Sequence, residues 1–246
     1  MTTPTVMVIA HRGASSYGPE NTLAAFDLAL QMEVRHIELD VDVTSDGHIV
    51  VIHDDTVDRT TNGSGAVTRH TLAALRALDA GSWFGTQFAG ERIPTFDEVL
   101  ARYKGRAHIH TEIKGHSPSL SQRTADVIRT HGMEGQVTMT SFQKVRLEEI
   151  RAYAPELPTG WLVREVSDAT IVQAHAMGLT QLCPPAQAVT PALVRRLHAE
   201  GFVARAWGVT TEELMQQVVQ AGADGMTINF PDKLIAYLKS HNYLWE

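Results

Sequence analysis

The chain has 246 residues, of which 43% are hydrophobic, so one large domain can fold without disulfides or a structural metal. Its formal net charge of −7 argues against general nucleic-acid binding, which depends on Lys and Arg. An anionic ligand would therefore need a local cluster of positive charge.

Several features of the sequence indicate the compartment. The run MTTPTVMVIAHRG has no basic segment and no long apolar core, so we expect no signal peptide. No apolar run approaches the roughly 18 residues that a membrane-spanning helix needs. The single cysteine, Cys183, excludes an intramolecular disulfide and suits a reducing compartment. We therefore expect a cytoplasmic protein without membrane insertion.

Short β-rich runs alternate with amphipathic segments along the chain. The predicted strands are 6–10, 36–41, 108–114, 137–140, 159–163, 180–183, 203–208 and 224–229. The predicted helices are 21–33, 96–103, 120–131, 143–153, 168–177, 191–200, 212–221 and 232–239. Eight strands interleaved with helices predict an α/β fold, a (β/α)8 TIM barrel, with residues 1–246 as a single domain.

One further predicted strand, 49–53, does not fit this alternation. It follows strand 36–41 too closely for a parallel crossover, so we expect an antiparallel hairpin that carries His53 over the barrel mouth. Residues 54 to about 94 then form a long excursion rich in Gly, Thr and Asp. We expect a small inserted subdomain there, because loops this long in compact domains are usually functional.

The second predicted strand separates an apolar face from an acidic one. In HIELDVD, the acidic residues Glu38, Asp40 and Asp42 share one side of the strand. The apolar side suits packing against the helices, so the acidic side points into the barrel. A solvated edge strand would give the same pattern, but a closed barrel has no edge strands. Crowded buried carboxylates are costly unless a cation neutralises them.

The next barrel strand, in AHIHTEIK, repeats this pattern. Glu112 and Lys114 share its polar side near the C-terminal end, where barrel active sites lie. Glu112 can complete a carboxylate trio with Glu38 and Asp40, which suits Mg²⁺ or Ca²⁺ rather than Zn²⁺. Lys114 would add a fixed positive charge nearby, and the less favoured alternative is a simple counter-ion to a strand carboxylate.

The same rim carries His11 and Arg12 from the first strand and His53 from the hairpin. We assign the two imidazoles to acid/base chemistry, because the carboxylates already satisfy a hard ion. The planar guanidinium of Arg12 matches a phosphate group. A metal, an arginine and a lysine beside two histidines are typical of a phosphoryl-transfer site.

The runs HRGASSYGPENTLAAFDLAL and IELDVDVTSDGHIVVIHDDTVDRTTNGSG resemble the glycerophosphodiester phosphodiesterase family. The signature of that family is His-Arg, then Glu-x-Asp, then a second His. Later matches are TEIK, TSF, Trp207 and GADGMTINFPDKL, so the resemblance covers essentially the whole chain. The chain is most similar to the short, soluble, cytoplasmic bacterial members.

The resemblance implies a barrel with an inserted subdomain and a site with three sets of residues. The catalytic pair is His11 and His53. The ligands of one divalent cation, Mg²⁺ or Ca²⁺ with Mn²⁺ as a further option, are Glu38, Asp40 and Glu112. The phosphate contacts are Arg12 and Lys114. Trp207, at a strand end, is interpreted as a wall of the glycerol pocket.

The resemblance also implies an activity and a small-molecule substrate. Glycerophosphodiesters, which are deacylated phospholipids, would give sn-glycerol 3-phosphate and an alcohol. In the mechanism proposed for the family, one histidine deprotonates the glycerol 2-hydroxyl, which attacks phosphorus, and the other protonates the leaving alcohol. Water then opens the cyclic phosphate. The residues leave open which histidine starts as the base.

Two alternatives stay open. One is a lyase acting on lysophospholipids or sphingolipids that stops at the cyclic phosphate, which the lack of an evident membrane-docking helix disfavours. The other is a barrel that binds a phosphometabolite without turnover, which the histidine pair and the acidic trio disfavour.

The chain departs from the family pattern at a few positions. Glu33 stands where a helix-ending Gly is usual, and Asn229 stands where an Asp is usual. Thr210 replaces the usual Asn after Trp207, and we expect these changes to affect the shape of the alcohol-side pocket. We interpret His110 and Arg205 as a hydrogen-bonded pair in the barrel core with nearby acids, in preference to a role in substrate binding.

Overall fold

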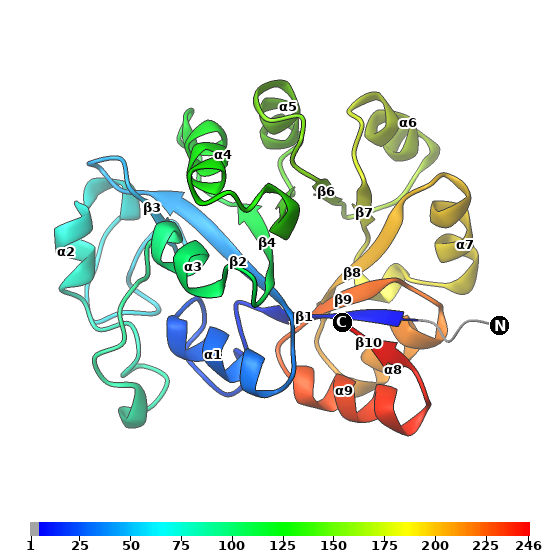
Figure 1. The fold of residues 1–246 in the computed structure, drawn as a ribbon, viewed down its shortest axis with the longest axis horizontal. Coiled ribbons are helices and arrows are strands. Elements are labelled where there is room, and N and C mark those ends of the chain that lie inside the picture. The colour runs from blue at the N-terminus through cyan, green and yellow to red at the C-terminus, as the bar shows by residue number, and fades with distance from the viewer. Residues whose placement is uncertain (1–4) are drawn as a thin grey trace.

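Eight parallel strands close into a barrel in the computed structural model, which describes residues 5–246 (Figure 1). The barrel strands are β1 (Thr5–His11), β2 (His36–Val43), β4 (His108–Ile113), β5 (Val137–Ser141), β6 (Thr159–Leu162), β7 (Gln181–Cys183), β8 (Val203–Val209) and β9 (Gly225–Ile228). Pairing of β1 with both β9 and β2 closes the ring. The predicted (β/α)8 TIM barrel is therefore confirmed.

Helices surround the barrel on its outside (Figure 1). They are α1 (Leu23–Gln31), α3 (Phe96–Tyr103), α4 (Leu120–His131), α5 (Lys144–Tyr153), α6 (Asp168–Ala176), α7 (Pro191–Ala199), α8 (Glu212–Gln220) and α9 (Pro231–Ser240). Helix α3 begins with a capping box between Thr95 and Glu98. Helix α1 is shorter than predicted, because Asn21 and Glu33 adopt φ angles of 58° and 67°, which a right-handed helix excludes.

The predicted hairpin is present, with β3 (Ile49–Val51) antiparallel to β2. Residues 54–94 follow it and include η1 (Val67–Arg69), α2 (Leu72–Arg76) and η2 (Thr86–Phe88). In Figure 1 this segment lies to one side of the barrel, beyond β3. It packs around an apolar cluster made of Val50, Ile52, Val57, Val67, Leu75, Ala80 and Ile93.

Three short elements complete the described chain. Strand β10 (Leu244–Trp245) pairs in parallel with β1, which the sequence did not lead us to expect. The 3₁₀ turns η3 (Glu134–Gln136) and η4 (Ala186–Ala188) precede β5 and α7. Within residues 5–246, every helix is too short or too polar to cross a lipid bilayer.

The two sides of β2 face different surroundings. Leu39 and Val41 are fully buried in an apolar cluster with Phe96 of α3. Because neighbouring strand residues point to opposite sides, this packing turns Glu38 and Asp40 into the barrel. The fold therefore directs acidic groups toward the barrel mouth.

Candidate active site

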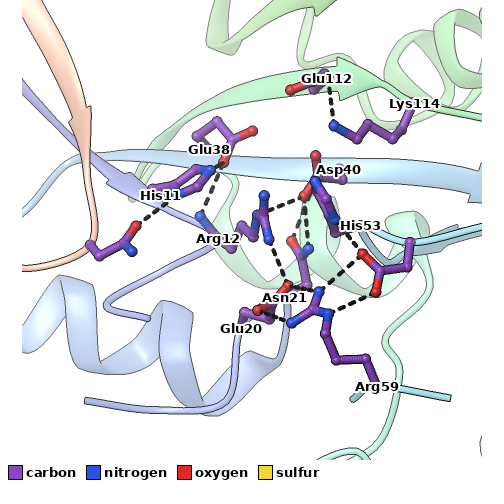
Figure 2. A network of polar contacts seen from close by, with 12 residues as sticks. His11, Arg12, Glu20, Asn21, Glu38, Asp40, His53, Arg59, Glu112 and Lys114 are labelled. Atoms are coloured by element: carbon purple, nitrogen blue, oxygen red, sulfur yellow. Dashed lines mark hydrogen bonds and ion pairs between the residues drawn. The ribbon is translucent and has the colours of Figure 1, made fainter. Parts of the chain in front are cut away.

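The predicted histidines, acids and phosphate contacts meet at the ends of β1 and β4, along β2 and just after β3 (Figure 2). A cavity of about 280 Å³ opens there. Its lining includes His11, Arg12, Glu38, His53, Glu112, Lys114 and Trp207. Asp40 is buried beside the cavity, with its Oδ2 3.2 Å from Arg12 Nε. The structure thus brings the predicted residues together.

Three carboxylates from β2 and β4 converge inside the mouth. Glu38, Asp40 and Glu112 are buried, and their nearest oxygens all lie within 4.8 Å of one another. Burial and the charge of Asp40 raise the pKa of Glu112 to about 7. Burial and the two neighbouring carboxylates raise the pKa of Glu38 well above its usual range. The trio is therefore hard to ionise without a counter-charge.

This trio fits a hard divalent cation. It supplies only oxygen donors, and Asp40 Oδ1 is buried without a hydrogen-bond partner among the described residues. An unsatisfied carboxylate oxygen is costly in a low-dielectric interior. An ion would satisfy that oxygen and relieve the repulsion among the three charges.

The His-Arg-Gly triplet forms a tight turn after β1. Arg12 and Gly13 have φ angles of 56° and 82°. A Cβ atom on Gly13 would lie 2.6 Å from the carbonyl carbon of Ala25 in α1, so a glycine is needed for this close approach. The Arg12 backbone N–H donates to Glu38 Oε2 at 3.1 Å, which anchors the turn beside the trio.

His11 is oriented by an amide from the other end of the chain. Its Nδ1 lies 2.6 Å from Asn229 Oδ1, so Nδ1 is the donor and Nε2 keeps a lone pair. Burial and the charge of Arg12 lower the pKa of His11 to about 4. The ring is therefore neutral at pH 7 and able to accept a proton.

His53 is held by a chain of ion pairs that reaches into the insertion (Figure 2). Its Nδ1 lies 2.5 Å from Asp54 Oδ1. Arg59 donates from Nε to Asp54 Oδ2 at 2.7 Å and from Nη1 to Glu20 Oε2 at 2.8 Å. Glu20 also accepts from Arg12 Nη1 at 2.8 Å, so the network links the two segments that carry the histidines.

The two predicted phosphate contacts are paired with acids. Arg12 contacts Asp40 as described, and Lys114 Nζ lies 3.3 Å from Glu112 Oε1. Lys114 is therefore placed as a counter-ion of a strand carboxylate, which was the alternative interpretation of this residue. Both cations also line the cavity, where an anionic ligand would meet them.

An aromatic pair forms another part of the cavity wall. The rings of Trp207 and Phe142 meet edge to face, with centroids 4.9 Å apart. Trp207 Nε1 donates to the carbonyl of Val163 at 3.1 Å, which fixes the indole. Trp207 thus lines the cavity, and its contact with a substrate stays a prediction.

The model of the glycerophosphoryl diester phosphodiesterase family matches residues 11–233. The chain belongs to this family. A curated glycerophosphodiester phosphodiesterase from Caldanaerobacter subterraneus is 39% identical over 233 residues, covering 93% of this chain and 96% of that protein. Another, from Bacillus subtilis, is 33% identical over 250 residues, covering 92% of this chain and 84% of that protein.

A solved structure shares the same fold. It is a phosphodiesterase of Oleispira antarctica in complex with the product sn-glycerol-3-phosphate. It matches with a TM-score of 0.88 and 29% identity over 96% of this chain and 97% of that chain. The resemblance to glycerophosphodiester phosphodiesterases inferred from the motifs is therefore confirmed at the level of the family.

In this family member, sequence reasoning missed the residues that orient the two histidines. Asp54 directly follows His53, and this adjacency was an available signal. Glu20 and Arg59 stand 39 residues apart, and nothing local connects them. Asn229 was noted as a departure from the family pattern, but not as the partner of a residue 218 positions away.

Within residues 5–246, His110 and Arg205 form the expected hydrogen bond neither with each other nor with an acid. Both side chains are buried inside the barrel. His110 Nε2 lies 3.1 Å from His36 Nδ1 instead, and Arg205 Nη1 donates to Thr227 Oγ1 at 3.1 Å. The error arose because strand alternation gives the direction of a side chain but not its partner.

Proposed function

We propose that the chain hydrolyses glycerophosphodiesters to sn-glycerol 3-phosphate and an alcohol, with a divalent cation and through a cyclic phosphate. The observation that carries this proposal is one cavity lined by two oriented histidines and two acids of the buried carboxylate trio, with Asp40 beside it. Family membership supports the activity. The product complex of the Oleispira antarctica relative supports sn-glycerol 3-phosphate as the product.

Glu38, Asp40 and Glu112 would hold the cation, which is Mg²⁺, Ca²⁺ or Mn²⁺. When bound, the cation would supply positive charge that offsets the trio and the negative charge of the phosphodiester. Arg12 and Lys114 would bind the phosphate from the same cavity, because both already carry positive charge there. Trp207 would pack against the glycerol.

We assign His11 as the base of the first step and His53 as the acid. Neutral His11 takes the proton of the glycerol 2-hydroxyl on Nε2, and the freed oxygen bonds to phosphorus. The bond from phosphorus to the alcohol breaks. His53, whose Nδ1 faces the Asp54 carboxylate, acts as the acid and donates a proton to the departing alcohol oxygen.

The second step reverses these roles. His53, now neutral, takes a proton from water, and the water oxygen bonds to phosphorus. The bond from phosphorus to the glycerol 2-oxygen breaks, and His11 returns its proton to that oxygen. Both histidines regain their starting states, and one water has been consumed.

Release of sn-glycerol 3-phosphate by the purified protein tests the proposal. We expect release with a divalent cation, and loss of release with EDTA or in His53→Ala. Phosphorus NMR identifies the product, and a persistent cyclic phosphate would indicate a lyase instead. Cation-supported binding without any product would indicate a binding protein.

A further inference from the structure

A second cavity, of about 450 Å³, adjoins the first at the barrel mouth. The two cavities share His53, Glu112, Lys114 and Phe142 as wall residues. The second cavity continues past the ends of β4 and β5, from the hairpin toward the end of β6. Its further lining is Asp54, Asp55, His116, Ser141, Gln143 and Arg164.

The acids and bases at the shared wall, and Asp54 next to it, are largely paired with other charged groups. Asp54 is engaged by His53 and Arg59, and Glu112 is engaged by Lys114. The other ionisable side chains that line the second cavity lack such partners in the described part of the chain. Asp55, Arg164 and His116 are exposed, and none makes an ion pair or a side-chain hydrogen bond within residues 5–246.

Asp55 and Arg164 reach the second cavity from two different loops. Asp55 follows the hairpin, whereas Arg164 follows β6. The guanidinium of Arg164 lies 5.7 Å from the centroid of Phe142, within the range of a cation–π contact. This contact holds Arg164 against a ring that both cavities share, with its N–H donors free.

The position of the second cavity indicates which part of the substrate it faces, an argument that rests on the proposed function. Phosphorus must lie near the shared residues His53, Glu112 and Lys114. The attacking oxygen and the leaving oxygen take opposite sides of phosphorus. With the glycerol in the cavity lined by His11 and Trp207, the leaving alcohol faces the second cavity.

We propose that the second cavity binds the leaving alcohol and favours one that carries both a carboxylate and an ammonium group, as serine does. Arg164 binds the carboxylate through its planar N–H donors. Asp55, from the other loop, binds the ammonium carried by the same carbon atom. Arg164 and Asp55 therefore determine which head group is preferred and take no part in bond breaking.

A matched pair of substrates tests this proposal. The glycerophosphodiesters of serine and of ethanolamine differ by one carboxylate, so the ratio of their kcat/KM values isolates its recognition. We expect the wild-type protein to favour the serine diester by about five- to tenfold, because the contact is charge-assisted but exposed. Arg164→Gln should bring the ratio close to one, chiefly by lowering kcat/KM for the serine diester.

Two further variants complete the test. Arg195→Gln, an exposed arginine on α7, is the matched control and should keep the wild-type ratio. Asp55→Asn should lower the preference for the ethanolamine diester over the diester of glycerol, whose leaving alcohol is uncharged.

A wild-type ratio near one, or a ratio that Arg164→Gln leaves unchanged, would overturn this proposal. Turnover of the ethanolamine diester would still uphold the proposed function in that case. Lack of turnover of all three diesters would overturn both.

Discussion

The two ends of the barrel interior carry opposite kinds of ionisable side chains, although β2 and β4 supply both. Where these strands begin, His36 lies opposite His108, and at the mouth Asp40 lies opposite Glu112. Burial lowers the pKa values of His36 and His108 to about 4. Burial acts in the other direction on Glu112 and raises its pKa to about 7.

The two ends differ in how they reduce their charge. A buried histidine becomes neutral by losing a proton, so at pH 7 the imidazoles need no counter-ion. A buried carboxylate at pH 7 must instead keep a proton or find a cation. The carboxylates at the mouth are therefore stabilised by a bound cation, whereas the imidazoles at the other end are not. This explains why ionisable residues from the same strands form a candidate site at one end only.

Removing a carboxylate from the mouth should reduce activity far more than removing an imidazole from the opposite end. We expect Glu112→Gln to lower kcat/KM by roughly a thousandfold, because the cation loses a charged ligand. His108→Gln, a matched change on the same strand, should stay within about fivefold of wild type. Release of sn-glycerol 3-phosphate at saturating cation measures both, and equal losses would contradict the distinction between the ends.

Without a bound metal, the carboxylates at the barrel mouth should make the free energy of unfolding fall as the pH rises. The pKa of Glu112 is about 7 in the folded chain and near 4.5 when unfolded, so the folded state binds more protons between these values. Stability without metal therefore falls from pH 4.5 through 7. Relative to the wild-type protein, we expect Glu112→Gln to raise the free energy of unfolding by on the order of 2–3 kcal/mol near pH 8 and by little near pH 5. Urea unfolding in EDTA measures this, and an equal gain at both pH values would contradict it.

The histidine end should show the opposite pH dependence. The pKa of His108 is about 4 in the folded chain and near 6.5 when unfolded, so the unfolded state binds more protons between these values. This contribution to stability is therefore lost as the pH falls from 6.5 through 4. We expect His108→Gln to lose less stability than wild type over that range, by roughly 1–2 kcal/mol. Urea unfolding of both proteins measures this. An equal loss of stability in the two proteins as the pH falls would contradict the prediction.

Adding a carboxylate beside His11 should move the pH profile of catalysis. In Asn229→Asp, a negative charge replaces the amide that contacts His11 Nδ1 and favours the protonated ring. We expect the acid limb of kcat/KM to move upward by about one pH unit, because the base must be neutral to act. Asn242→Asp, at an exposed asparagine, is the control, and an unmoved acid limb would argue against His11 as the base.

The smallest effect is expected outside the interior, where α1 leads into β2. Glu33 has a φ of 67°, which glycine adopts more easily, and its exposed carboxylate pairs with Lys239 at 2.7 Å. We expect Glu33→Gly to stabilise the protein by about 0.5–1 kcal/mol, because relief of backbone strain exceeds the loss of a surface ion pair. Lys239→Ala measures the ion pair alone, and a lower urea midpoint for Glu33→Gly would contradict the prediction.

Local pattern was sufficient to predict the barrel and the trio. Alternation in HIELDVD turned Glu38 and Asp40 to one side of a strand, and alternation in AHIHTEIK did the same for Glu112. Parallel strands in a barrel end at one rim, so these residues had to lie close together. Both arguments need only the order of residues along the chain.

The partners of the catalytic candidates depended on closure of the barrel. Pairing of β1 with β9 brings Asn229 to His11, and the packing of the insertion brings Arg59 to Glu20. The junction of two cavities at Phe142 arises in the same way, from loops that meet only at the rim. Residue order constrains near neighbours strongly, whereas contacts between distant segments require the strand register and loop paths that the folded chain provides.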